Sequence, residues 1–82
     1  MITKQQFARN KKYISVEEGS CIGRYAYGVY KNWLIDEMYD ESIDRLYHTI
    51  EGVDEEFEEL SDAEEVLYNL YLADQKLTED LI

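Results

Sequence analysis

The sequence RYAYGVYKNW at positions 24–33 decides the fold class, because it suits two different structures. A helix at about 16–36 that includes this stretch would place Ile22, Ala26 and Trp33 on one face, at the spacing of a core helix. Within a strand or hairpin its tyrosines and valine would fit well, since aromatic and β-branched residues favour sheets. The three glycines within 16–36, Gly19, Gly23 and Gly28, would cost about 1 kcal/mol each in a helix, which supports the hairpin. We expect the helix, with an α+β fold containing a short hairpin near 24–33 as the alternative.

Helix signals on both sides of this stretch favour an all-α fold. Three capping boxes, each typical of a helix start, are Thr3–Gln6, Ser15–Glu18 and Ser61–Glu64. Asp40 and Gly52 would begin and end a further helix. The predicted helices lie at about 4–12, 16–36, 41–51 and 62–77. Because proline is absent and glycine is scarce, we expect a single domain over residues 1–82, folded as a compact bundle of about four helices.

The charge of the chain is concentrated in one segment. Residues 36–65 hold 14 of the 19 acidic residues, with Arg45 as their only fixed positive charge. As one helix, this segment would carry a negative charge every ~3 Å, close to the ~3.4 Å spacing of phosphates along a DNA strand. Residues 1–35 are net basic. With a net charge of −11, the protein is expected to be repelled by nucleic acid and attracted to basic surfaces.

We interpret the acidic segment as a surface that binds a basic protein. A run of like charge is most often a solvated face, but this net charge exceeds the magnitude of about 2–8 that solubility requires. Two tyrosines within the segment would add ring faces that attract arginine. The candidate binding residues are Asp36, Glu37, Asp40, Glu41, Asp44, Glu51, Asp54, Glu55, Glu56, Glu58, Glu59 and Asp62, together with Tyr39 and Tyr47.

No motif in the chain indicates catalysis or a cofactor. The acids lack the alternating oxygen ligands and central glycine of a calcium loop, and residues 19–24 lack the spacing of a phosphate loop. His48, the only histidine, is expected late in the 41–51 helix, where a positive charge suits the helix dipole. No set of nucleophile, base and orienting group is recognisable. We therefore predict a protein that is not an enzyme, with no catalytic residues, no metal site and no cofactor.

The sequence also predicts where the protein resides. Cys21 is the only cysteine, so no internal disulfide can form, and a reducing cytoplasm is the expected compartment. The N-terminus has no apolar core of a signal peptide. The longest apolar run, at 25–30, is far shorter than the ~20 residues of a membrane span. We expect a cytoplasmic protein without a membrane partner.

In size and charge, the chain resembles the small acidic proteins by which phages block host defence, including anti-CRISPR proteins and anti-restriction DNA mimics. The resemblance covers the general character of the chain and no aligned residue. It implies a phage protein in the host-cell cytoplasm that binds the basic groove of a DNA- or RNA-binding defence protein, such as a CRISPR-Cas effector. Such an inhibitor blocks access of nucleic acid to its target without binding nucleic acid itself.

Two features leave other interpretations open. The basic N-terminal third departs from a pure phosphate mimic. It would either contact acidic parts of the partner or pair with the acidic half of a second copy in a homodimer. The abundance of tyrosine supports a different function, a non-enzymatic interaction or regulatory module that binds through an aromatic and apolar face. Salt distinguishes the two functions, because binding led by carboxylates weakens with ionic strength and apolar binding does not.

Overall fold

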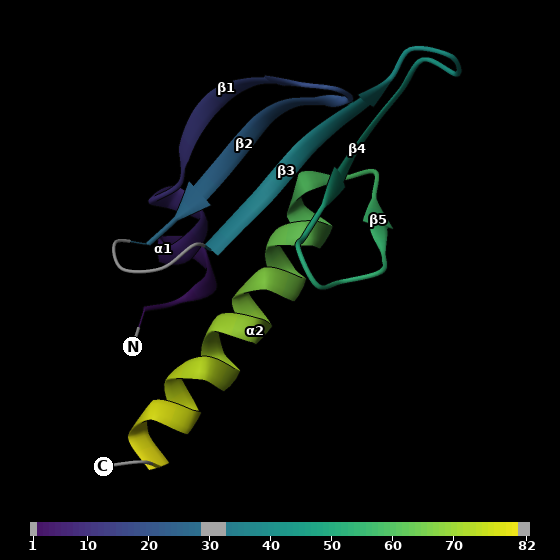
Figure 1. Cartoon of the computed structure of the whole chain (residues 1–82). Helices are drawn as coiled ribbons and strands as arrows, with labels where there is room; N and C mark the ends of the chain where they lie inside the picture. The colour runs from purple at the N-terminus through teal and green to yellow at the C-terminus, as the bar shows by residue number, and fades with distance from the viewer. Residues whose placement is uncertain (1, 29–32, 81–82) are drawn as a thin grey trace.

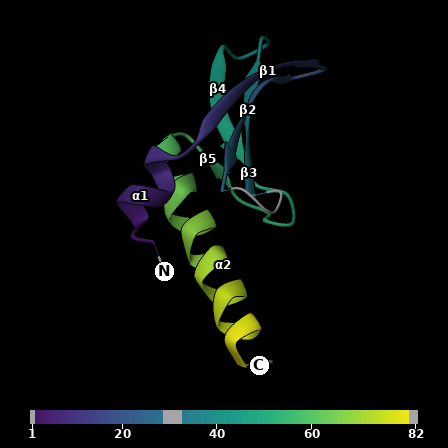
Figure 2. The same cartoon turned by 90° about the vertical axis from the view of Figure 1, so that its left-hand side faces the viewer.

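The computed structural model describes residues 2–28 and 33–80, and it shows that the all-α prediction is wrong. The elements are α1 (Lys4–Arg9), β1 (Lys12–Glu18), β2 (Cys21–Tyr27), β3 (Trp33–Asp40), β4 (Arg45–Thr49), β5 (Glu56–Phe57) and α2 (Leu60–Asp80). The five strands form one antiparallel sheet in the order β1-β2-β3-β4-β5. Both helices lie on the same side of this sheet (Figures 1 and 2). The fold is therefore a two-layer α+β arrangement, and not a helical bundle.

The stretch that decided the fold class belongs to the hairpin alternative, and the predicted helix at 16–36 is wrong. Strands β2 and β3 pair antiparallel, with Tyr27 opposite Trp33 and Tyr25 opposite Ile35. Residues 29–32, between them, lie outside the described part of the chain. The strand is favoured over the helix because its alternate residues lie on the two faces of the sheet. The aromatic side chains can then pack against side chains of neighbouring strands instead of along one helix face.

The predicted helix at 41–51 is also wrong. Residues 41–44 form the turn between β3 and β4, and Arg45–Thr49 is a strand in which His48 is buried while its neighbours are more exposed. Asp40 caps this turn and not a helix: its Oδ1 accepts hydrogen bonds from the Ser42 backbone nitrogen at 3.0 Å and hydroxyl at 2.6 Å. Side chains of a strand alternate between its two faces, and the charged residues around 45–49 obscure this alternation in the sequence. The helix prediction therefore did not detect the strand.

The first and last predicted helices are confirmed, with different limits. Helix α1 begins with the predicted capping box, in which Thr3 Oγ1 accepts from the Gln6 nitrogen and Gln6 Oε1 accepts from the Thr3 nitrogen. The second box does not cap a helix, because Ser15 and Glu18 lie within β1. Helix α2 begins at Leu60, before the third predicted cap. Among the described residues, no helix has the length and apolar character needed to cross a bilayer.

The core lies where α1 and α2 cover part of the sheet. Its buried residues are Phe7, Tyr27, Ile35, Ile50, Phe57, Ala63 and Leu67. The Phe7 ring stacks on Tyr27 with the ring centroids 5.0 Å apart, which joins α1 to the sheet. The molecule is elongated, 49 × 22 × 21 Å, and the β1–β2 and β3–β4 hairpins extend beyond the start of α2 (Figure 1). The helices therefore leave the far end of the sheet uncovered.

Gly23 shows why one strand position requires a residue without a side chain. A Cβ atom at this position would lie 2.1 Å from the Tyr13 hydroxyl oxygen and 2.5 Å from its ring. Tyr13 lies over the glycine and donates a hydrogen bond to Glu37. An alanine at 23 would therefore push Tyr13 away from that carboxylate.

We predict that Gly23→Ala lowers the melting temperature in the wild-type background. In a Tyr13→Ala background the same change should raise stability by about 0.5–1 kcal/mol, because glycine within a strand is normally destabilising by that amount. Thermal unfolding of the four proteins of this double-mutant cycle measures the difference. Equal effects of Gly23→Ala in both backgrounds would show that the tyrosine is not what excludes a side chain.

Candidate functional site

The strand order separates the charges of the chain onto opposite edges of the sheet. Strand β1, next to the basic helix α1, forms one edge, and the short strand β5 forms the other. The acidic segment 36–65 runs through β3, β4 and β5 into α2. It is therefore not a single line of charge, and the phosphate-like spacing expected from one helix does not exist. For the predicted binding surface, the important distinction is therefore which carboxylates have a lysine or arginine partner in the fold and which do not.

Three of the predicted binding residues already have a cationic partner within the chain. Asp36 Oδ1 accepts from Arg24 Nε at 2.6 Å. Arg45 contacts Glu56 at 2.9 Å and Glu58 at 2.6 Å. Hydrogen bonds to Glu58 and then Glu56 raise the pKa of the Arg45 guanidinium further above its ordinary value. These three acids hold strands together, so they are less available to a partner protein.

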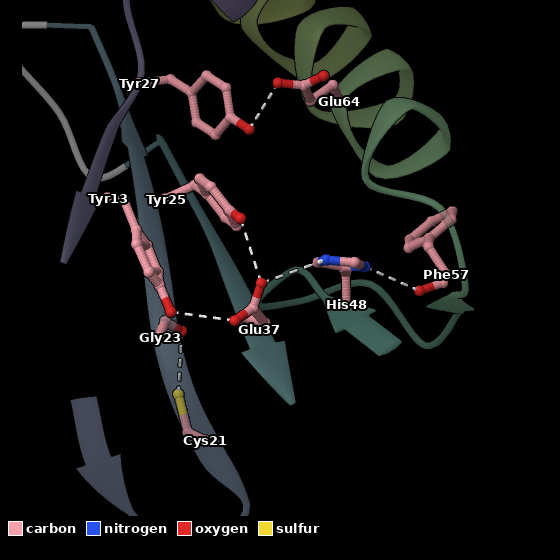
Figure 3. Close-up of polar contacts among 9 residues, drawn as sticks. All are labelled: Tyr13, Cys21, Gly23, Tyr25, Tyr27, Glu37, His48, Phe57 and Glu64. Atoms are coloured by element: carbon pink, nitrogen blue, oxygen red, sulfur yellow. Dashed lines mark hydrogen bonds and ion pairs between the residues drawn. The ribbon is translucent and has the colours of Figure 1, made fainter. Parts of the chain in front are cut away.

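Glu37 lies inside a polar network on the helix-covered side of the sheet (Figure 3). Its side chain is only 14% exposed. Tyr13 donates to one carboxylate oxygen at 3.0 Å and Tyr25 donates to the other at 3.1 Å. His48 Nε2 lies 4.0 Å from the second oxygen, and its Nδ1 lies 3.2 Å from the carbonyl oxygen of Phe57. The structure thus places Glu37 among its own partners and not on an open surface.

Both predicted binding tyrosines are engaged within the chain. Tyr39 donates a short hydrogen bond to Asp44. The Arg45 guanidinium carbon lies 4.5 Å from the centroid of the Tyr47 ring. The contact between arginine and a ring face that we expected to form with a partner is therefore formed with the chain's own arginine. Tyr47 belongs to the scaffold of β4 and not to a ready binding site.

The remaining predicted residues form a set that we call the acidic edge. Its members lie in the connections that flank β4 and β5 and in the first turn of α2, and each side chain is exposed. They are Glu41, Asp44, Glu51, Asp54, Glu55, Glu59 and Asp62. In the described part of the chain, no lysine or arginine forms an ion pair with any of them. Asp40 is only partly exposed and serves the turn, where the Ser42 hydroxyl and backbone lower its pKa.

Two large apolar side chains are exposed beside the acidic edge. Ile43 in the β3–β4 turn is 63% exposed, and Leu46 in β4 is 45% exposed. A protein interface has an apolar centre and a polar rim, and charges that complement the partner set its orientation. The acidic edge therefore combines carboxylates with exposed apolar side chains.

Glu64 is a residue of the fold whose importance the sequence analysis missed. One of its carboxylate oxygens accepts from Tyr27 at 2.8 Å and from Lys11 Nζ at 2.8 Å, and the residue is 7% exposed. Burial and this hydrogen bond raise the pKa of the Tyr27 phenol. Helical spacing was the available signal, because Glu64 shares the inner face with Leu67 and Tyr68. The capping-box pattern with Ser61 predicts a different role for it, at the start of the helix.

The chemistry of these groups favours structural roles. Both oxygens of Glu37 have phenol donors, and buried Cys21 donates its thiol proton to the Gly23 carbonyl at 3.4 Å. Within residues 2–28 and 33–80, no three histidine, cysteine, aspartate or glutamate side chains are grouped as metal ligands would be. The acidic edge is the exposed part of the predicted binding set whose members form no ion pair in the described part of the chain.

Comparison of the chain with protein-family models, curated proteins and solved structures found no match.

The tyrosine contacts predict a loss of stability at alkaline pH. The pKa values of Tyr25 and Tyr27 are raised first by burial and then by the charge and hydrogen bonds of Glu37 or Glu64. The folded state thus favours the neutral phenols. Stability should be complete below pH ~10, the pKa of an unfolded tyrosine, and should fall as the pH rises above it. Urea unfolding at pH values from neutral to strongly alkaline measures this loss.

Tyr27→Phe should lower the free energy of unfolding at neutral pH by about 1.5–3 kcal/mol, the usual contribution of a hydrogen bond to a charged group. It should also reduce the alkaline loss. Tyr47→Phe is the matched control, because the contact of Tyr47 with Arg45 uses the ring face. If the two variants unfold alike at neutral and alkaline pH, the Tyr27–Glu64 bond does not stabilise the fold.

Proposed function

We propose that this protein binds a basic surface of another protein through its acidic edge and thereby blocks access of DNA or RNA to that surface. The observation that carries the proposal is the division of the carboxylates. Asp36, Glu37, Glu56, Glu58 and Glu64 have phenol, lysine or arginine partners. The carboxylates of the acidic edge, like the exposed Glu17 and Glu18 of β1, form no ion pair within the described chain. The proposed action is steric and electrostatic, and the protein catalyses no reaction.

Carboxylates of this kind suit a surface that normally holds phosphate. Lysine and arginine side chains bind both groups through charge-assisted hydrogen bonds, and arginine contacts both in a bidentate manner. The net charge of −11 favours approach to a basic groove and opposes contact with nucleic acid itself. Ile43 and Leu46 would add apolar contact at the same edge. The class of partner is a nucleic-acid-binding defence protein, such as a CRISPR-Cas effector, in the cytoplasm of a host cell.

The second candidate function is an interaction module that binds through an apolar surface. The observation in its favour is the sheet face without helices, where Ile14 is 49% exposed and Leu34 and Met38 are half-buried. That face also carries the Arg24–Asp36 ion pair at its centre. Binding through this face would depend weakly on salt, whereas binding through the acidic edge would weaken steeply.

The variants that test the proposal must leave the fold intact. Reversing Glu56 or Glu58 would break the contacts with Arg45, so these residues are unsuitable. Asp54 and Glu55 are exposed in the loop before β5. Their matched control is a reversal of Glu17 and Glu18, which are exposed at the end of β1 and give the same change in net charge.

We predict that Asp54→Lys with Glu55→Lys weakens partner binding roughly tenfold, because each exposed ion pair contributes about 0.2–1 kcal/mol and becomes a repulsion. Glu17→Lys with Glu18→Lys should have little effect. Immobilised wild-type protein captures partners from a bacterial lysate in low salt and releases them in high salt. Each captured protein is then purified, and its displacement from labelled DNA or RNA by the wild type and both variants is measured.

Three results would contradict the proposal. The first is that the captured proteins keep their nucleic acid in the presence of the wild-type protein. The second is that both double variants compete as well as the wild type. The third is binding that persists unchanged in high salt, which would favour the uncovered sheet face. Circular dichroism of both variants confirms that any loss of binding is not a loss of fold.

A further inference from the structure

The edge strand β1 is a second surface that the proposed function does not use. Among the residues that the structure describes, β1 pairs with β2 along one edge and has no strand partner along the other. Six of its seven residues are exposed, and Tyr13 is 51% and Ile14 49% exposed. The opposite edge is formed by β5, which has only two residues. Short edge strands are a usual protection against strand pairing, and β1 lacks that protection.

The sequence of β1, KYISVEE, is self-complementary in one orientation only. It is basic at its start, at Lys12, and acidic at its end, at Glu17 and Glu18. Two parallel copies would place like charges beside each other. Two antiparallel copies centred on Ser15 would place Lys12 of each opposite Glu18 of the other. Opposite charges facing across strands stabilise a pair, and like charges destabilise it.

The apolar residues are complementary in the same register. An antiparallel pair centred on Ser15 places Ile14 of one copy opposite Val16 of the other, twice across the two-fold axis. Side chains directly opposite share a face of the sheet, so the exposed Ile14 would be covered by this contact. The register of β1 with β2 shifts between Ser15 and Glu18, but Glu18 is again paired with Cys21, so the strand continues through all seven residues.

We propose that two copies of this protein form a symmetric dimer through antiparallel pairing of their β1 strands around Ser15. The two sheets then join into one, with an acidic edge at each end. A single strand buries less than the ~1,200 Å² of a standard interface, and both copies are strongly negative, so the dimer forms weakly and with clear dependence on concentration.

Sedimentation velocity from micromolar to millimolar concentration tests the dimer. The average mass should rise from the 9.8 kDa of one chain toward twice that value. Lys12→Glu and Glu18→Lys should each abolish the rise, because each places like charges opposite each other across the axis. The double variant restores opposite charges and should dimerise like the wild type. If net charge controlled association, Glu18→Lys would strengthen the dimer instead.

A disulfide provides an independent measurement of the register. Ser15→Cys would place two thiols opposite each other at the two-fold axis, where opposed Cα atoms of an antiparallel pair lie ~4.5–5.5 Å apart and suit a disulfide. Mild oxidation should give a covalent dimer with Ser15→Cys and none with the exposed control Ser61→Cys or with the wild type, whose Cys21 is buried. A wild-type monomer at all concentrations, or equal cross-linking of both variants, would overturn the proposal.

Discussion

The buried carboxylate of Glu64 is the contact on which the arrangement of this protein depends. It joins α2 to the sheet through Tyr27 and to the start of β1 through Lys11, with both distances at 2.8 Å. A buried charge is tolerated only when it is paired and hydrogen-bonded, and loss of one partner is strongly destabilising. The contact ties the first turns of α2, which pack against β3, β4 and β5, to the end of β2 as well. Because the helix begins there, the hairpins beyond it stay uncovered (Figure 1).

The same need for pairing divides the acidic residues of the chain. Carboxylates with little exposure on the sheet or in the core obtain phenols or lysine, as Glu37 does from Tyr13 and Tyr25 and Glu64 from Tyr27 and Lys11. Carboxylates in the connections around β4 and β5 are solvated and need no internal partner. An acidic protein of this size can thus fold despite its net charge, since most acids without an ion pair in the described chain lie in exposed connections. Under the proposed function, those of the acidic edge contact the basic surface of the partner.

The sequence predicted the helices that begin and end the fold, because their capping residues and apolar spacing are local signals. It did not predict the sheet, because the tyrosine-rich stretch at 24–33 suits two structures, and only the pairing of Tyr25 with Tyr13 and Ile35 favours one. The acidic edge was predictable by residue type. Which acids belong to it was not predictable from the sequence. Asp36 and Glu58 are excluded by ion pairs with arginines that are distant in the sequence and become neighbours only in the fold.

The central claim is that the carboxylates of the acidic edge, and not those of the interior, are free to bind cations on a partner. Nuclear magnetic resonance of the labelled protein, titrated with a short arginine-rich peptide in low salt, tests it most directly. The account predicts shifts of the amides and carboxylates at Glu41, Asp54 and Glu55, with Glu37 and Glu64 unchanged. Shifts centred on β1 and β2, or equal shifts of all carboxylates, would contradict it.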